Sequence, residues 1–323
     1  MLKERRERAK VRKALYCILL LSPLSYLLST LYTGGDQLHY HQVYELISDK
    51  GLIESYLIYR NNLNSSEVGH FILTWLASGL IEKNLFVTVL NTLLLMYGVL
   101  FLSRVTHRSP LLILILLLSN YYIFVLMFSA ERLKVAFLFL FAFMYYYQKI
   151  SLRMPLLLMA IISHLSIALL IVSSFAPRLI RDCRRLISAG KLNIALLKYF
   201  ILFAFVAVVL FDQIYNKIFG YLLEYFDVFN ILKITALTLF IAFFIRNQRP
   251  TYFLVMFVLG VAAIIIGDGR VNIFAFLYTQ YHFLLHEKLK SLPFVMMTIY
   301  LFLKTLEFIY KVVIYADAYY VAT

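Results

Sequence analysis

The stretch "LMFSAERLKVAFLF", residues 126–139, places Glu131, Arg132 and Lys134 between two apolar runs. Ionisable side chains are costly at membrane depth, so a junction between two helices accommodates them better than the middle of one helix. Apolar runs of about 20 residues, long enough to cross a bilayer as a helix, recur from one end of the chain to the other. The stretch therefore predicts a boundary between two membrane-spanning helices.

The composition also indicates a membrane protein. Of the 323 residues, 63% are hydrophobic and 15% are charged, and the mean hydropathy is +0.82. Soluble domains carry about 25% charged residues, and a membrane β-barrel would show alternating strands, which the sequence lacks. We therefore expect an all-α, polytopic integral membrane protein with about 9–11 transmembrane helices, re-entrant segments included. Full spans are expected at 14–33, 84–102, 110–128, 132–148, 192–211, 228–245, 251–267, 270–286 and 293–314.

Basic residues indicate which side of the membrane each loop occupies. Seven Lys/Arg lie in residues 1–13, which are therefore expected to form a cytoplasmic N-terminus before a retained anchor helix. The net charge of +14 is spread over short loops beside spans, an arrangement that does not indicate nucleic-acid binding. Residues 14–314 are expected to form a single transmembrane domain, followed by a short tail at 315–323. Cys17 and Cys183 suggest no disulfide or metal framework.

Two apolar pieces, 67–81 and 154–175, decide which loops lie inside. If 67–81 lies in the outer interface, the basic loops "SRVTHRS" and "QKISLR" both fall inside, and 34–83 forms an amphipathic segment at the outer face. If 154–175 bends near Ser163 and His164 as a re-entrant hairpin, the basic loop after it also stays inside. A re-entrant turn must be buried in protein or face a water-filled cavity. This reading places His164 at the floor of an outward-facing cavity, whereas a single crossing by either piece would put basic loops outside.

The segment "GGDQLHYHQVYEL", residues 34–46, follows the first span. Asp36, Tyr40 and Tyr44 recur at i, i+4 and i+8, so they share roughly one face of a helix. One interpretation is a helix cap with interfacial tyrosines, which are common at membrane surfaces. The other is a carboxylate and aromatic rings presented to a sugar-like ligand.

Two arginines begin outward-to-inward spans on the predicted outer side. Arg132 follows Glu131, and Arg270 follows Asp268 in the turn "GDGR". One interpretation is two separate structural ion pairs, each with the neighbouring carboxylate. The other is a diphosphate clamp, because guanidinium forks form bidentate hydrogen bonds to phosphate oxygens.

Glu67 and His164 are further polar candidates on the outer side. A single histidine in an apolar segment is commonly a core residue with a satisfied hydrogen bond, but a cavity floor is where a titrating imidazole is useful. The sequence has no Asp-x-Asp motif and no glycine-rich phosphate loop, and His282 and His286 lack a third ligand. We therefore predict neither a bound metal nor a cofactor.

In their order and spacing, the polar motifs resemble those of the EpsG-like, Wzy-type polysaccharide polymerases of bacterial cell envelopes. The resemblance covers roughly residues 30–290. It rests on Asp36/Tyr40/Tyr44, "EVGHFIL" (67–73), "ERLKVAF" (131–137), "HLSIAL" (164–169) and "GDGRVNIF" (267–274).

The resemblance implies a GT-C-like glycosyltransferase in the bacterial plasma (inner) membrane, with its active site facing the periplasm or exterior. Donor and acceptor would be glycan repeat units on undecaprenyl diphosphate, joined without a metal into an exopolysaccharide or O-antigen. A flippase, a chain-length regulator and the surrounding membrane lipids would be its partners. The implied roles are catalysis for His164, Asp36 and Glu67, diphosphate binding for Arg132 and Arg270, and sugar binding for Tyr40 and Tyr44.

Two other classes of function fit a cationic outer cavity. A flippase or transporter of lipid-linked sugars would make no glycosidic bond, and such proteins often show repeated halves, which this sequence lacks. An O-antigen-ligase-like transferase would use the same donor with a different acceptor. Ligases of that kind usually have a larger outer loop than any loop of this chain.

Overall fold

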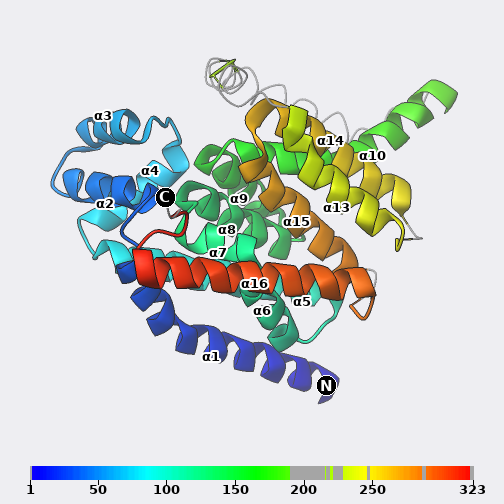
Figure 1. Cartoon of the computed structure of the whole chain (residues 1–323), viewed down its shortest axis with the longest axis horizontal. Helices are drawn as coiled ribbons and strands as arrows, with labels where there is room; N and C mark the ends of the chain where they lie inside the picture. The colour runs from blue at the N-terminus through cyan, green and yellow to red at the C-terminus, as the bar shows by residue number, and fades with distance from the viewer. Residues whose placement is uncertain are drawn as a thin grey trace. The chain divides into compact units, whose positions relative to one another are not determined.

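In the computed structural model, the described residues are 2–189, 215, 219–220, 228–245, 248–285 and 289–320, and within them the regular elements are all helices (Figure 1). The all-α class predicted from the sequence is therefore confirmed for this part of the chain. The helices of its first two thirds are α1 (Leu2–Leu31), α2 (Asp36–Leu46), α3 (Leu52–Leu63), α4 (Val68–Ser78), α5 (Lys83–Thr106), α6 (Pro110–Leu118), α7 (Tyr121–Phe128), α8 (Glu131–Tyr145), α9 (Ile150–Ser163) and α10 (Ser166–Ala189). The rest are η1 (Val228–Ile231), α13 (Leu232–Ala242), α14 (Arg249–Ile266), α15 (Asp268–Leu285) and α16 (Leu292–Tyr315).

The chain divides into two compact units. The first comprises Met1–Ile167 and Phe294–Thr323, so α16 at the C-terminal end belongs with the N-terminal helices. The second comprises Ala168–Pro293. That the two units act as the single transmembrane domain expected for 14–314 stays a prediction.

Several helices have the length and apolarity of membrane spans. Among the described residues, these are Val11–Leu31 within α1, the whole of α5 and the whole of α16. These helices match three of the expected spans, and they support a helical membrane protein. The expected span at 192–211 lies outside the described residues.

The expected span at 110–128 is broken into two helices. Helices α6 and α7 meet at an angle of 76°, so a single straight helix is the wrong description of this segment. The local cause is Asn120, whose side-chain oxygen accepts a hydrogen bond from the backbone N–H of Tyr122 at 2.8 Å. A side-chain oxygen in this position caps a new helix and ends the old one.

A second interruption lies at His164, between α9 and α10. His164 has extended backbone angles, and its Nδ1 accepts a hydrogen bond from the backbone N–H of Ser166 at 3.2 Å. The helix is thus interrupted at the place singled out in the sequence, although re-entry into the membrane stays a prediction. Helix α10 then continues to Ala189, through basic residues for which we expected a loop. Leucine, arginine and alanine in this stretch are good helix formers, which accounts for the difference.

The segment between the first span and α5 folds into three short helices, α2, α3 and α4. Val43, Ile47, Tyr59 and Phe71 form a small buried core between them. Trp75 adds a link, because its indole N–H donates to the carbonyl of Lys50 at 3.1 Å. The predicted segment at 34–83 is therefore a packed helical layer, and its location at the outer face stays a prediction.

In the second unit, α14 and α15 form a hairpin at the "GDGR" turn. Gly267 connects them with a φ of 83°, a left-handed value that favours glycine. Deeper in the hairpin, the Tyr252 hydroxyl lies 2.9 Å from Thr279 Oγ1. Arg270 lies in the first turn of α15.

Candidate functional site

The carboxylate of Glu67 is the centre of a buried polar cluster in the first unit. Its Oε2 lies 3.1 Å from Arg132 Nη1 and accepts a hydrogen bond from Ser65 Oγ at 3.0 Å. Its Oε1 lies 3.6 Å from His164 Nδ1. The side chains of Glu67 and His164 are 5% and 4% exposed. Glu67, Arg132 and His164, three separate candidates from the sequence, therefore lie together in the structure.

Three helix ends position this cluster. Glu67 is the N-cap residue of α4, Arg132 lies in the first turn of α8, and His164 separates α9 from α10. Gly69 lets α4 approach α9, since a Cβ at this position would lie only 2.8 Å from the backbone nitrogen of Ser163. No side chain larger than hydrogen fits there without a backbone shift.

Tyr40, on α2, also contacts Arg132. Arg132 Nε donates a hydrogen bond to the Tyr40 hydroxyl oxygen at 3.1 Å. Burial raises the pKa of Tyr40 to about 12, so the phenol stays protonated at neutral pH. The Arg132 side chain is 18% exposed, which leaves part of the guanidinium accessible.

A second buried cluster adjoins the first and contains Glu131. Its carboxylate forms an ion pair with Lys83, and His70 Nε2 lies 3.9 Å from Oε2. Burial raises the pKa of Tyr59, and its hydroxyl lies 2.9 Å from His70 Nδ1, within hydrogen-bond distance. Burial also lowers the pKa of His70, which keeps the ring neutral. The pairing of Arg132 with Glu131, one of the interpretations drawn from the sequence, is therefore wrong.

Lys134 extends the buried polar contacts towards α1. Its ammonium donates to Asn91 Oδ1 at 3.0 Å and to the Met127 carbonyl at 2.7 Å. Asn91 in turn donates to Ser25 Oγ at 3.0 Å. Lys134 is fully buried, so its charge has lost its hydrating water. These oxygens take the place of that water. Its role, left open by the sequence, is to connect α8 with α5 and α1.

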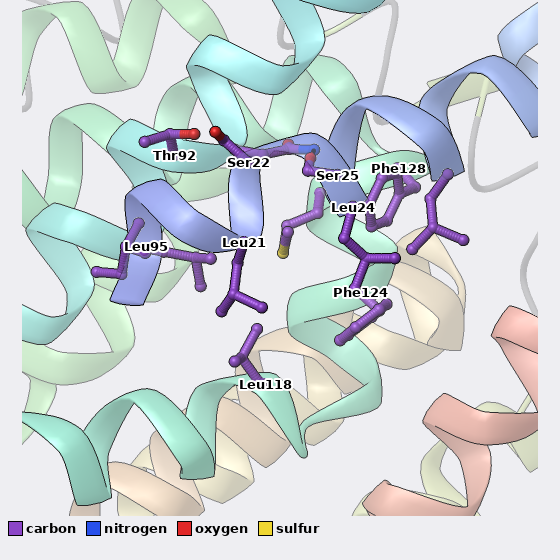
Figure 2. Close-up of a pocket in the computed structure, with 13 residues that line it drawn as sticks. Leu21, Ser22, Leu24, Ser25, Thr92, Leu95, Leu118, Phe124 and Phe128 are labelled. Atoms are coloured by element: carbon purple, nitrogen blue, oxygen red, sulfur yellow. Dashed lines mark hydrogen bonds between the residues drawn. The ribbon is translucent and has the colours of Figure 1, made fainter. Parts of the chain in front are cut away.

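An apolar pocket lies beside these contacts, between α1, α5, α6 and α7. Figure 2 shows Leu21 and Leu24 of α1 on one side, with Leu118 and Phe124 on the other. Its volume of about 40 Å³ has room for little more than a water-sized group. We therefore regard it as a packing gap rather than a ligand site.

The other candidates from the sequence lie apart from Glu67. Asp36 begins α2 and, within the described part of the chain, makes none of the contacts of the Glu67 cluster. Tyr44 donates its hydroxyl to the Ile81 carbonyl at 2.9 Å. Arg270 belongs to the second unit, so its part in a diphosphate clamp stays a prediction.

Lys83 is the most important residue that sequence reasoning overlooked. Its ammonium lies 5.5 Å from the Tyr40 ring centroid and 5.4 Å from that of Tyr44, while its charge is paired with Glu131. This lysine precedes the apolar run of α5, where a snorkelling surface lysine is the ordinary expectation.

Compared with known proteins, the chain matches no family model, no curated protein and no solved structure. A carboxylate and an imidazole close together can accept and pass on a proton. A neighbouring, partly exposed guanidinium can stabilise an anion that forms beside them.

Proposed function

We propose that this protein is a membrane glycosyltransferase that polymerises undecaprenyl-diphosphate-linked oligosaccharide repeat units into a bacterial surface polysaccharide. The observation that supports it most is the meeting of Glu67, Arg132 and His164 with Tyr40. The most distant of these residues, Tyr40 and His164, are 124 positions apart in the sequence. The fold connects all four through pairwise contacts of Glu67 with Arg132 and His164, and of Arg132 with Tyr40. Such a group of buried ionisable residues is typical of a functional site.

The proposed reaction moves a growing glycan from its lipid carrier to a new repeat unit. The acceptor hydroxyl attacks the anomeric carbon of the donor, a new glycosidic bond forms, and the bond to the diphosphate breaks. The hydroxyl proton goes to Glu67 or His164, which act as a proton-accepting pair. Negative charge develops on the leaving diphosphate, and Arg132 stabilises it, with Arg270 as the second proposed ligand.

The proposed location is the plasma membrane, with the N-terminus in the cytoplasm and the Glu67 cluster near the outer surface. Undecaprenyl diphosphate is retained by the bilayer, so the donor reaches the site laterally from the membrane. Asp36 and Tyr44 contact sugars of the substrate in this proposal, and neither a nucleotide sugar nor a metal is required. A flippase supplies the lipid-linked units, and a chain-length regulator limits the product.

An experiment in the host bacterium tests the proposal. Arg132→Ala should abolish surface polymer and cause single lipid-linked repeat units to accumulate, while the protein is still inserted in the membrane. Arg104→Ala is the matched control, because Arg104 is an exposed arginine that donates to the Tyr145 carbonyl, away from Glu67. Normal polymer lengths in Arg132→Ala would contradict the proposal. If Arg132→Ala instead removes the lipid-linked repeat units from the outer leaflet, the protein is a flippase.

A further inference from the structure

A second pocket lies in the first unit, between α2, the end of α4 and the start of α5. Its volume is about 420 Å³, within the range of small-molecule sites. The polar side chains that line it are those of His41, Tyr44, Glu45, Ser48, Ser78, Glu82, Lys83 and Asn84. The Glu67 cluster is formed by other side chains.

Hydrogen-bond acceptors in this pocket are held in fixed positions. Glu82 accepts from the Tyr26 hydroxyl at 2.8 Å and from Asn84 Nδ2 at 2.8 Å. The side-chain oxygen of Asn84 is then buried, and it has no hydrogen-bond partner among the described residues. A buried acceptor of this kind costs free energy until a donor reaches it. Asn84 therefore borders the pocket with a hydrogen-bond acceptor that no described residue uses, which favours a ligand with hydroxyl or amide donors.

The charges of the pocket disfavour an anionic ligand. Glu45 and Glu82 contribute two carboxylates, while the ammonium of Lys83 is paired with Glu131. Burial lowers the pKa of His41, and the positive charge of Lys83 lowers it further, so the imidazole is neutral at neutral pH. A neutral imidazole has one donor and one acceptor nitrogen, which suits neighbouring hydroxyl groups.

We infer that this pocket binds an uncharged, hydroxyl-rich sugar residue, and this inference rests on the proposed function. The pocket adjoins the reaction site, because Lys83 lies over the Tyr40 ring and Tyr40 receives a hydrogen bond from Arg132. A sugar bound there would hold the glycan chain beside Arg132. Glu82, Asn84 and Glu45 would determine which sugars are accepted.

Binding can be measured without any polymerase assay. The purified full-length chain in detergent is applied to an array of uncharged and uronate-containing oligosaccharides. We expect binding to a subset of the uncharged glycans and none to their uronate counterparts. Asn84→Ala should weaken that binding by about tenfold, as expected for a lost hydrogen bond to a well-placed donor. Glu54→Gln should not change it, because this exposed carboxylate pairs with Lys50 outside the pocket.

A second variant tests the charge argument. In Glu45→Gln/Glu82→Gln the discrimination against uronates should decrease, since the repelling carboxylates are gone. Thermal unfolding curves establish that each variant is folded. Binding to no glycan, equal binding of uncharged and uronate glycans by the unmodified chain, or unchanged binding by folded Asn84→Ala would overturn the inference.

Failure of this inference and failure of the proposed function give different results. If the chain polymerises repeat units but Asn84→Ala leaves glycan binding unchanged, the pocket assignment is wrong and the polymerase proposal stands. If the chain binds glycans through Asn84 but joins no units, the pocket is supported and the polymerase proposal is wrong.

Discussion

Arg132 Nη1 lies 3.1 Å from Glu67 Oε2, and the carboxylate is almost fully buried whereas the guanidinium is partly exposed. The pair therefore fixes an arginine at the edge of a buried site, with part of its fork available to another anion. Removing one partner from a buried ion pair typically costs about 3–5 kcal/mol, because the remaining charge is left uncompensated. This relationship makes the two residues the first targets for mutation.

Arg132→Lys separates charge from geometry. Lysine keeps the positive charge but cannot contact Glu67, Tyr40 and a phosphate oxygen with one planar fork. We expect the polymerisation rate to fall by about 100-fold, comparable to the loss of one donor that stabilises a developing anion. Initial rates in proteoliposomes measure this. A rate within twofold of the unmodified protein would show that charge alone is needed, contrary to the account.

Gly69→Ala tests the close approach of α4 to α9. The new methyl group would lie 2.8 Å from the Ser163 backbone nitrogen, so the helices must move apart and Glu67 must move away from His164. We expect a destabilisation of about 1–3 kcal/mol, typical of overpacking, together with reduced activity. Thermal unfolding and polymer yield are the measurements.

Gly51→Ala is the matched control for that experiment. Gly51 precedes α3 with a φ of −64°, and a Cβ there would contact nothing within 4 Å. This variant should keep the stability and activity of the unmodified protein. Equal effects of the two substitutions would show that the α4–α9 contact has no special importance.

His164 has two roles that different substitutions separate. Its Nδ1 accepts from the Ser166 N–H and also faces Glu67. His164→Asn can retain the helix cap, because asparagine is a good capping residue, but it cannot transfer a proton. We expect His164→Asn to unfold at the temperature of the unmodified protein and to lose about 100-fold in rate, the contribution of general base catalysis. Full activity in His164→Asn would reduce His164 to a structural cap.

The Lys83–Glu131 pair is expected to be structural. Lys83→Met leaves the buried carboxylate without its cation and should reduce stability by about 3–5 kcal/mol. Lys83→Met/Glu131→Leu removes both charges and should recover part of that loss, since apolar residues can replace a buried pair. Melting temperatures in detergent test this. Additive losses in the double variant would show that the two charges do not interact.

Membrane topology is tested by cysteine labelling in a chain whose native cysteines are replaced by serine. Ser188→Cys, exposed on α10, should react with an impermeant maleimide only after permeabilisation. Glu45→Cys, exposed on α2, should react in intact cells. The reverse pattern would place the Glu67 cluster at the cytoplasmic side and contradict an outer-leaflet reaction.

Much of the site could be anticipated because ionisable residues are conspicuous in apolar sequence. Glu67, Arg132 and His164 were each selected for that reason. Their mutual contacts could not be anticipated, because they depend on how α4, α8 and α9 pack. The sequence suggested Glu131 as the partner of Arg132, but neighbouring residues on a helix point in different directions. Glu131 therefore meets Lys83, while Arg132 meets Glu67.

The helices, too, were predictable where they depend on the average composition of a segment and not where they depend on a single residue. The long apolar runs of α1, α5 and α16 identified them as spans, since length and composition are local properties. The break between α6 and α7 depends on the capping oxygen of Asn120, a single residue within an otherwise continuous apolar run. A hydropathy pattern averages over such a residue and therefore predicts one straight helix.

The most direct measurement is the product made by the purified full-length chain in proteoliposomes supplied only with lipid-linked repeat units from its host. We expect a ladder of polymers and release of undecaprenyl diphosphate, without added metal or nucleotide sugar. Folded Glu67→Gln should leave single units unjoined, because the carboxylate that orients Arg132 and faces His164 is lost. Single units from the unmodified protein, or a normal ladder from Glu67→Gln, would contradict the proposed function.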